Sequence, residues 1–195
     1  MKSEILADVK AYYRSKMENY FLTSVLVVIV GFVVYLIALS DDKRKGGAII
    51  ILIVVLVYFI CTCIISILKY INLKKSIKEL CPTETEQIEL VHDFKEAISV
   101  FSDEMRIGKD YTYIASETGC WIIDTQKIDD FSQEHRRGRG SCTVIYAVVV
   151  GMESVPHTRT IYVTSIADVA SKSAEEHIQE AKSVLRQMQK GAEDV

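Results

Sequence analysis

The chain has 195 residues, and its formal charge of -3 is unevenly divided: residues 1–80 hold 11 Lys/Arg against 6 Asp/Glu, and residues 81–195 hold 12 against 20. This length suffices for one ordinary domain and a further segment. The acidic C-terminal part is poorly suited to phosphate backbones, which excludes nucleic acid as an expected partner, whereas the basic N-terminal part suits anionic lipid headgroups.

Residues 1–20 are predicted to form an amphipathic helix. Apolar residues recur in it at helical spacing, with Lys and Glu between them: Ile5, Val9, Tyr12, Tyr13 and Met17. Because this segment leads directly into an apolar stretch, we expect it to lie in the headgroup region of a membrane.

Two apolar stretches without charged residues follow. The first, FLTSVLVVIVGFVVYLIAL, lies within residues 21–40, and the second, AIIILIVVLVYFICTCIISIL, lies within residues 47–69. Each has the length that a helix needs to cross about 30 Å of hydrocarbon, and a helix satisfies its backbone groups internally. The sequence therefore predicts a transmembrane helical hairpin over residues 21–69.

The connection Ser40–Gly47 is too short for anything but a tight hairpin, so both flanks lie on the same side. Eight Lys and Arg residues lie near the outer ends of the spans, against three in the connection. The positive-inside rule then predicts an integral protein of the cell inner membrane with both termini in the cytoplasm. A cleaved signal peptide is disfavoured, because acidic residues precede the first stretch and a second stretch follows it.

Neither of the two apolar stretches contains Asp, Glu, Lys, Arg or His, which favours an anchor over an ion pathway. Gly31 and Tyr58 each lie about ten residues from the connection, so the glycine could accommodate the ring; a glycine merely tolerated in lipid is the alternative. Thr62 and Ser66, together with two nearby cysteines, could line a contact between the helices.

Residues 70–82 are predicted to continue the second helix along the headgroups until Pro82. The segment carries Lys74, Lys75 and Lys78. These lysines are read either as a polybasic lipid sensor or as ordinary topology-setting charge, and we favour the second interpretation.

Residues 83–195 are predicted to form a soluble α+β domain. Thr83 and Glu86 make a capping box for a helix over residues 84–101. A small antiparallel sheet is then expected, and its predicted strands are Tyr111–Ser116, Cys120–Asp124, Ser141–Gly151 and Thr158–Thr164.

A last helix is expected to lay an apolar stripe across this sheet. Ser173 and Glu176 form its capping box. The stripe follows a 4-3-4-3 spacing and consists of Ala174, Ile178, Ala181, Leu185 and Met188.

This order of elements resembles the bacterial membrane-anchored pleckstrin-homology-like (PH-like) domains of small membrane proteins, the YcxB-like group among them. The resemblance covers roughly residues 105–190. It is carried by YTYIASETGCWIIDTQKIDDF (Tyr111–Phe131) and by the closing strand and helix TIYVT…SAEEHIQEAKSVLRQ. It implies a binding or regulatory module and brings no catalytic positions with it.

The basic segment His135–Gly140 is the most conspicuous local signal of the domain. Arg136, Arg137 and Arg139 could bind phosphates or lipid headgroups, whereas a solvated hairpin loop would look the same. With Lys74, Lys75 and Lys78, they form the candidate anion-binding or lipid-binding set.

Metal binding and catalysis are not expected. His135, Cys142, His157 and Cys120 lack the close spacing of a zinc site. Asp129 and Asp130 would point to opposite faces of a strand, and the nucleotide-binding and HExxH patterns are absent. Five scattered cysteines favour a reducing compartment over a disulfide framework. The sequence therefore predicts no enzyme, no cofactor and no metal.

Two functions agree with these features. The leading hypothesis is a non-enzymatic membrane-anchored module whose cytoplasmic domain associates with a protein partner or with its own copies. The alternative is a sensor of anionic lipid that uses the basic loop and the juxtamembrane lysines. A membrane-bound enzyme is the least favoured of the three classes considered.

Overall fold

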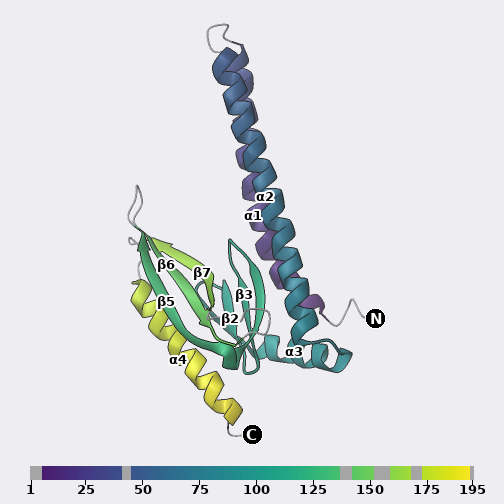
Figure 1. Ribbon diagram of the computed structural model, residues 1–195, viewed down its shortest axis with the longest axis vertical. Coiled ribbons are helices and arrows are strands. Elements are labelled where there is room, and N and C mark those ends of the chain that lie inside the picture. Colours follow the sequence, from purple (N-terminus) through teal and green to yellow (C-terminus); the bar gives the residue numbers. More distant parts are fainter. Residues whose placement is uncertain (1–5, 41–44, 137–141, 152–158, 168–172, 194–195) are drawn as a thin grey trace.

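The computed structural model describes residues 6–40, 45–136, 142–151, 159–167 and 173–193. A long helical hairpin carries, at one end, a smaller unit of antiparallel sheets and shorter helices (Figure 1). The fold is α+β, as the sequence predicts.

The hairpin consists of α1 (Ala7–Leu39) and α2 (Lys45–Leu80), which have 33 and 36 residues. Both helices are long and apolar enough to cross a membrane, as predicted. Apolar side chains are exposed around their outer parts; Ile49, Ile50 and Ile53 of α2 are examples. A helix that is apolar on every side has no polar face to present to water.

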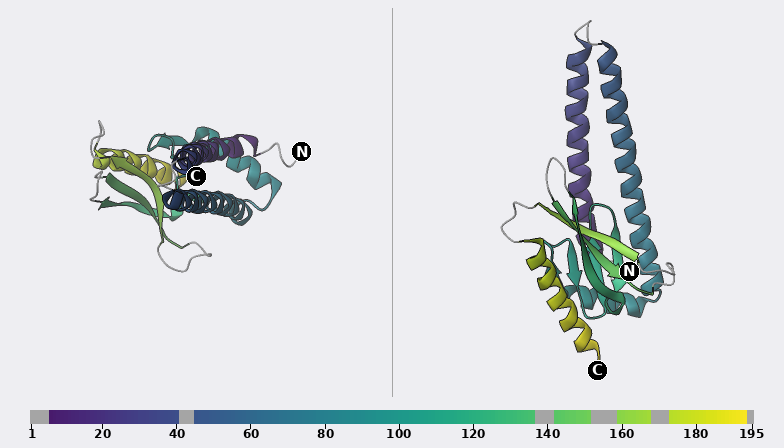
Figure 2. Two further views of the ribbon diagram at one scale, coloured as in Figure 1. Left: turned by 90° about the horizontal axis from the view of Figure 1, so that it is seen from above. Right: turned by 60° about the vertical axis from the view of Figure 1, so that its left-hand side comes forward.

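Gly31 brings the two helices together. A side chain at this position would collide with Val55 of α2, so the glycine allows a close approach of the backbones, as small residues do between membrane helices. The structure thus places Val55, rather than the predicted Tyr58, against Gly31. Toward the sheets the two helices diverge (Figure 2).

Helix α3 (Glu84–Glu96) begins at the predicted capping box. The backbone N–H of Glu86 donates to Thr83 Oγ1 at 3.3 Å, and the backbone N–H of Thr83 donates to Glu86 Oε2 at 2.8 Å. The prediction of a helix to residue 101 is wrong, because α3 ends at Glu96 and β1 (Ile98–Val100) follows. Its β-branched residues pair with the next strand, and this pairing prevails over helix continuation.

Within the described residues, seven strands form two antiparallel sheets. The first has the order β1-β2-β3-β4 and the second has the order β5-β6-β7. The predicted hairpin (β3 and β4) and the predicted pairing of the two later strands (β6 and β7) are confirmed. The remaining bounds are β2 Met105–Ile107, β3 Tyr111–Ala115, β4 Cys120–Asp124, a 3-10 turn at Thr125–Lys127, β5 Ile128–Arg136, β6 Cys142–Val149 and β7 Arg159–Ala167.

Strands β1, β2 and β5 were not predicted. The first two have only three residues each, too few to show an alternating pattern. β5 is mostly polar, and only its Ile128 and Phe131 are buried.

A first core lies among the two sheets and α4 (Ala174–Glu193). Helix α4 starts at the second predicted capping box, where the N–H of Glu176 donates to Ser173 Oγ at 3.2 Å and the N–H of Ser173 donates to Glu176 Oε2 at 3.1 Å. Residues of both sheets and of the α4 stripe are buried here, among them Ile114, Ile123, Ile145, Val163, Ile178, Ala181 and Leu185.

A second core joins the hairpin to the first sheet. Val9, Tyr12 and Tyr13 of α1 and Leu73 of α2 are buried with residues of α3, β3 and β4. Part of the apolar face of each predicted juxtamembrane helix thus packs on the protein, whereas Tyr70 and Ile71 remain exposed. That residues 1–20 and 70–82 lie along the headgroups stays a prediction. The amphipathic pattern is the same in both cases, because a lipid surface and a sheet are equally good partners for an apolar stripe.

Candidate functional site

The predicted basic loop is only partly within the described residues. Arg136 is the last residue of β5 and is exposed; its Nη2 lies 3.2 Å from Glu134 Oε2 and 3.0 Å from the hydroxyl of Tyr146. Glu134 raises the pKa of Arg136 further above its usual value. Arg137 and Arg139 lie outside the described residues. Arg136 is therefore already engaged with a neighbouring carboxylate on the sheet surface.

The predicted lysines lie elsewhere. Lys74, Lys75 and Lys78 are exposed on the last turns of α2, where Lys75 pairs with Glu79 at 3.7 Å. This end of α2 lies beside α3, whereas the end of β5 lies on the far side of the sheets (Figure 1). The structure does not bring Arg136 and the three lysines into one site.

The residues considered as metal ligands do not gather either. Among the residues that the structure describes, there is no group of three or more His, Cys, Asp or Glu able to hold a metal ion. Cys120 is buried in β4, and burial raises its pKa to about 11, so its thiol stays protonated at neutral pH. His135 is exposed on β5 beside Thr143, and His157 lies outside the described residues.

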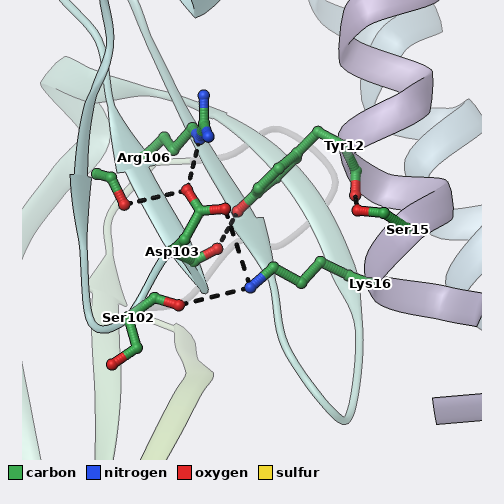
Figure 3. Close-up of polar contacts among 7 residues, drawn as sticks. Tyr12, Ser15, Lys16, Ser102, Asp103 and Arg106 are labelled. Carbon is green, nitrogen blue, oxygen red and sulfur yellow. Dashed lines mark hydrogen bonds and ion pairs between the residues drawn. The ribbon is translucent and has the colours of Figure 1, made fainter. Parts of the chain in front are cut away.

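The contact that fixes α1 to the sheets was not predicted. The turn between β1 and β2 has three consecutive residues with positive φ, from Phe101 to Asp103. The hydroxyl of Tyr12 donates to the carbonyl of Asp103 at 2.9 Å, and Lys16 Nζ lies 3.5 Å from the carbonyl of Ser102 (Figure 3). Left-handed backbone in non-glycine residues is costly, so this turn depends on the packing around it.

Arg106 completes this contact from β2. Its Nε lies 2.7 Å from Asp103 Oδ1, and its guanidinium lies over two rings, 4.9 Å from the centroid of Tyr12 and 5.0 Å from that of Phe94. The guanidinium of Arg106 thus contacts a ring of α1 and a ring of α3, and its ion pair with Asp103 fixes it to the first sheet.

Burial of the tyrosines in this contact gives a prediction about alkaline pH. Burial raises the pKa of Tyr12 and of Tyr13 above the usual value. The folded state then holds these protons more tightly than the unfolded state, so their contribution to stability is complete below about pH 10 and is lost as the pH rises further. We expect the free energy of unfolding to fall above pH 10 by up to about 1.4 kcal/mol per pH unit for each such tyrosine.

Tyr13→Phe should make this decline less steep, as measured by denaturant unfolding between about pH 8 and pH 11. Equal slopes for the parent and the variant would contradict the prediction.

A crevice of about 470 Å³ lies between α1 and α2 where they diverge. Its walls are mainly apolar, and its charged residues, Lys10, Arg14 and Glu18, all come from α1. The other lining residues are Tyr13, Met17, Phe21, Ser66, Tyr70 and Leu73. The sequence analysis did not predict this crevice, because it treats each helix separately. The only sequence signal is that Lys10 and Arg14 are four residues apart, which places them on the same face of α1.

A smaller and more polar cavity of about 240 Å³ adjoins it and shares Phe21 and Ser66. It is lined by Lys69 of α2, whose side chain is buried, and by Glu117 of the turn between β3 and β4. Thr62 and Ser66 also line it, and their hydroxyls donate to carbonyls of α2 itself. Thr62 and Ser66 therefore face a cavity whose wall also includes Phe21, Thr23 and Ser24 of α1.

A groove between β5 and α4 is the third candidate. Lys182 Nζ lies 2.8 Å from Asp130 Oδ1, and Gln189 Nε2 donates to the carbonyls of Thr125 and Ile128 at 3.1 and 2.9 Å. Two cavities lie beside α4. One of about 310 Å³ is lined by β5 and α4 around Asp130, and one of about 250 Å³ is lined by the start of α4 and by residues of β5, β6 and β7, among them Gln133, Thr143 and Ile166. In the described part of the chain, β5 pairs with β6 alone, so its other edge is free.

These features define an α+β protein with two helices that are long and apolar enough to span a membrane. No family model matches the chain, and no curated protein or solved structure matches it either.

Proposed function

We propose that this chain is a non-enzymatic, membrane-anchored binding module with a PH-like domain. Two antiparallel sheets of four and three strands in chain order, followed by a C-terminal helix that contributes to the core, support the PH-like assignment. The two apolar helices support the anchor.

Both helices cross the inner membrane, and the sheets lie on the cytoplasmic side. The excess of Lys and Arg at the sheet-side ends of the hairpin supports this orientation, since positive charge is retained in the cytoplasm. The second core then holds the domain at a fixed height and angle beneath the bilayer.

The edge of β5 that has no strand partner within the described residues is the observation that carries the binding function. An edge strand presents unpaired N–H and C=O groups, which an extended segment of another chain can pair with. Here α4 lies alongside. The cavity around Asp130 offers room for side chains of such a segment between β5 and α4, and the cavity around Gln133 offers room nearer the start of α4. The partner is a protein segment or the corresponding strand of a second copy.

Photo-crosslinking in native membranes tests this function. A photoreactive residue at Gln133, which is exposed in the groove, is expected to give a discrete adduct with one protein or with a second copy of the chain. The matched control is the same residue at His92, which is exposed on α3 away from the groove. The same set of adducts from both positions, or none from Gln133, would count against the proposal.

The alternative, a lipid sensor formed by the basic loop and the juxtamembrane lysines, has less support. Arg136 is paired with Glu134, and Lys74, Lys75 and Lys78 lie at the other side of the molecule. Residues so far apart would contact anionic headgroups independently, which gives weak attraction without a defined site.

A further inference from the structure

The crevice between α1 and α2 lies at the boundary between the charged, sheet-side parts of the helices and their uncharged, apolar parts. The charged Lys10, Arg14 and Glu18 line its sheet-side end, while Phe21 and Ser66 come from the stretches without charge. If the hairpin spans the bilayer as proposed above, this is the level of the lipid headgroups and of the first carbons of their acyl chains.

The mainly apolar walls of the crevice favour an apolar occupant. Met17, Phe21 and Tyr70 face a space of about 470 Å³, which is within the size range of small-molecule sites. Water gains few hydrogen bonds in such surroundings, and an empty space would forfeit packing contacts with the side chains around it. If the hairpin spans the bilayer as proposed above, the acyl chain of a neighbouring lipid is the nearest apolar group that can fill the crevice.

The charges at the rim select the headgroup. Lys10 and Arg14 are one turn apart on α1, and Arg14 uses its Nε to pair with Glu18 at 2.6 Å. A guanidinium has four further N–H donors, which can bind a phosphate. Two cations against one carboxylate leave an excess of positive charge, which favours a headgroup with net negative charge over a zwitterionic one.

We propose that this crevice binds one anionic glycerophospholipid, with the phosphate at Lys10 and Arg14 and an acyl chain between the two helices. The proposal rests on the membrane insertion proposed above. It uses neither the basic loop nor the lysines at the end of α2.

Native mass spectrometry of the full-length protein in detergent tests the proposal, with phosphatidylglycerol and phosphatidylcholine added in turn. We expect one retained phosphatidylglycerol per chain. The double variant Lys10→Gln, Arg14→Gln should weaken its retention by at least about tenfold, the factor expected for a lost charge-assisted hydrogen bond. The control Lys74→Gln, Lys75→Gln removes the same charge outside the crevice and should leave retention unchanged.

A second variant addresses the position of the acyl chain. Ser66→Leu adds apolar volume inside the crevice without changing charge, and it should reduce retention of phosphatidylglycerol as strongly as the charge variant does. Circular dichroism checks that each variant keeps the helix content of the parent.

Three results would overturn the proposal: equal retention by the two double variants, equal retention of the two lipids by the parent, or a lipid-free dimer in place of lipid adducts. A separate experiment tests the membrane insertion on which the proposal rests. If insertion fails, alkaline carbonate will extract the chain from the membrane fraction.

Discussion

Replacing Tyr13 by alanine is expected to lower the free energy of unfolding by about 3–5 kcal/mol, the range for loss of a buried aromatic side chain. Tyr13 is 1% exposed, although it belongs to a helix that continues into the apolar hairpin. Its ring packs edge-on against Tyr12, with centroids 5.1 Å apart, and its hydroxyl donates to the carbonyl of Trp121 at 2.6 Å. The substitution would leave a cavity between α1 and β4.

Thermal or denaturant unfolding of the detergent-solubilised protein measures this effect. Tyr70→Ala is the matched control, because Tyr70 lies on the other helix of the hairpin and is 60% exposed. Equal stability of the two variants would show that α1 contributes little to the folded domain. In that case the docking of the hairpin onto the sheets would lose its main support.

The second large effect is expected at Asp93. This carboxylate of α3 is buried and accepts three hydrogen bonds: from the N–H of Asp110 at 2.9 Å, from the N–H of Tyr111 at 3.2 Å and from the hydroxyl of Tyr113 at 3.0 Å. It thereby fixes the turn between β2 and β3. A side chain at Gly108 would collide with this carboxylate, which shows how closely the turn approaches α3.

Asp93→Ala is expected to cost about 3 kcal/mol, because it removes the acceptor of the N–H groups of Asp110 and Tyr111, while the hydroxyl of Tyr113 keeps the carbonyl of Leu90 at 2.8 Å. Three hydrogen bonds to a charged group would together contribute more than this to the free energy of unfolding. However, burial raises the pKa of Asp93, because the carboxylate loses its hydration, and this loss offsets part of the contribution. His92→Ala, at the exposed neighbouring position, is the control, and thermal unfolding is the measurement. A loss no greater than that of His92→Ala would contradict the assigned role.

The candidate sites differ in how far the sequence could predict them. The lysines of α2 were visible as a charge pattern, and they are exposed as expected of such a pattern. The crevice and the groove were not visible, because each is formed by two elements whose separation no local pattern encodes. Lys10 and Gln133 stand out only once α2 and α4 are in place beside them.

Backbone conformation shows the same division. Both capping boxes and the β3–β4 hairpin were predicted, because each depends on residues within a few positions of one another. The end of α3 was not predicted, because it depends on the pairing of the next residues, β1, with β2. That pairing depends on the left-handed turn at Phe101–Asp103, which is held from outside by Tyr12 and Arg106.

By itself the sequence determined two apolar helices joined by a short connection, an acidic α+β part, and the helix starts within it. These follow from length, composition and short-range periodicity, which are properties of contiguous residues. Only the tertiary structure decided that Val9, Tyr12 and Leu73 face protein rather than lipid, and that the helices diverge above the sheets. The physical reason is that the hydrophobic effect is non-directional: an apolar stripe specifies that it will be buried but not against which partner.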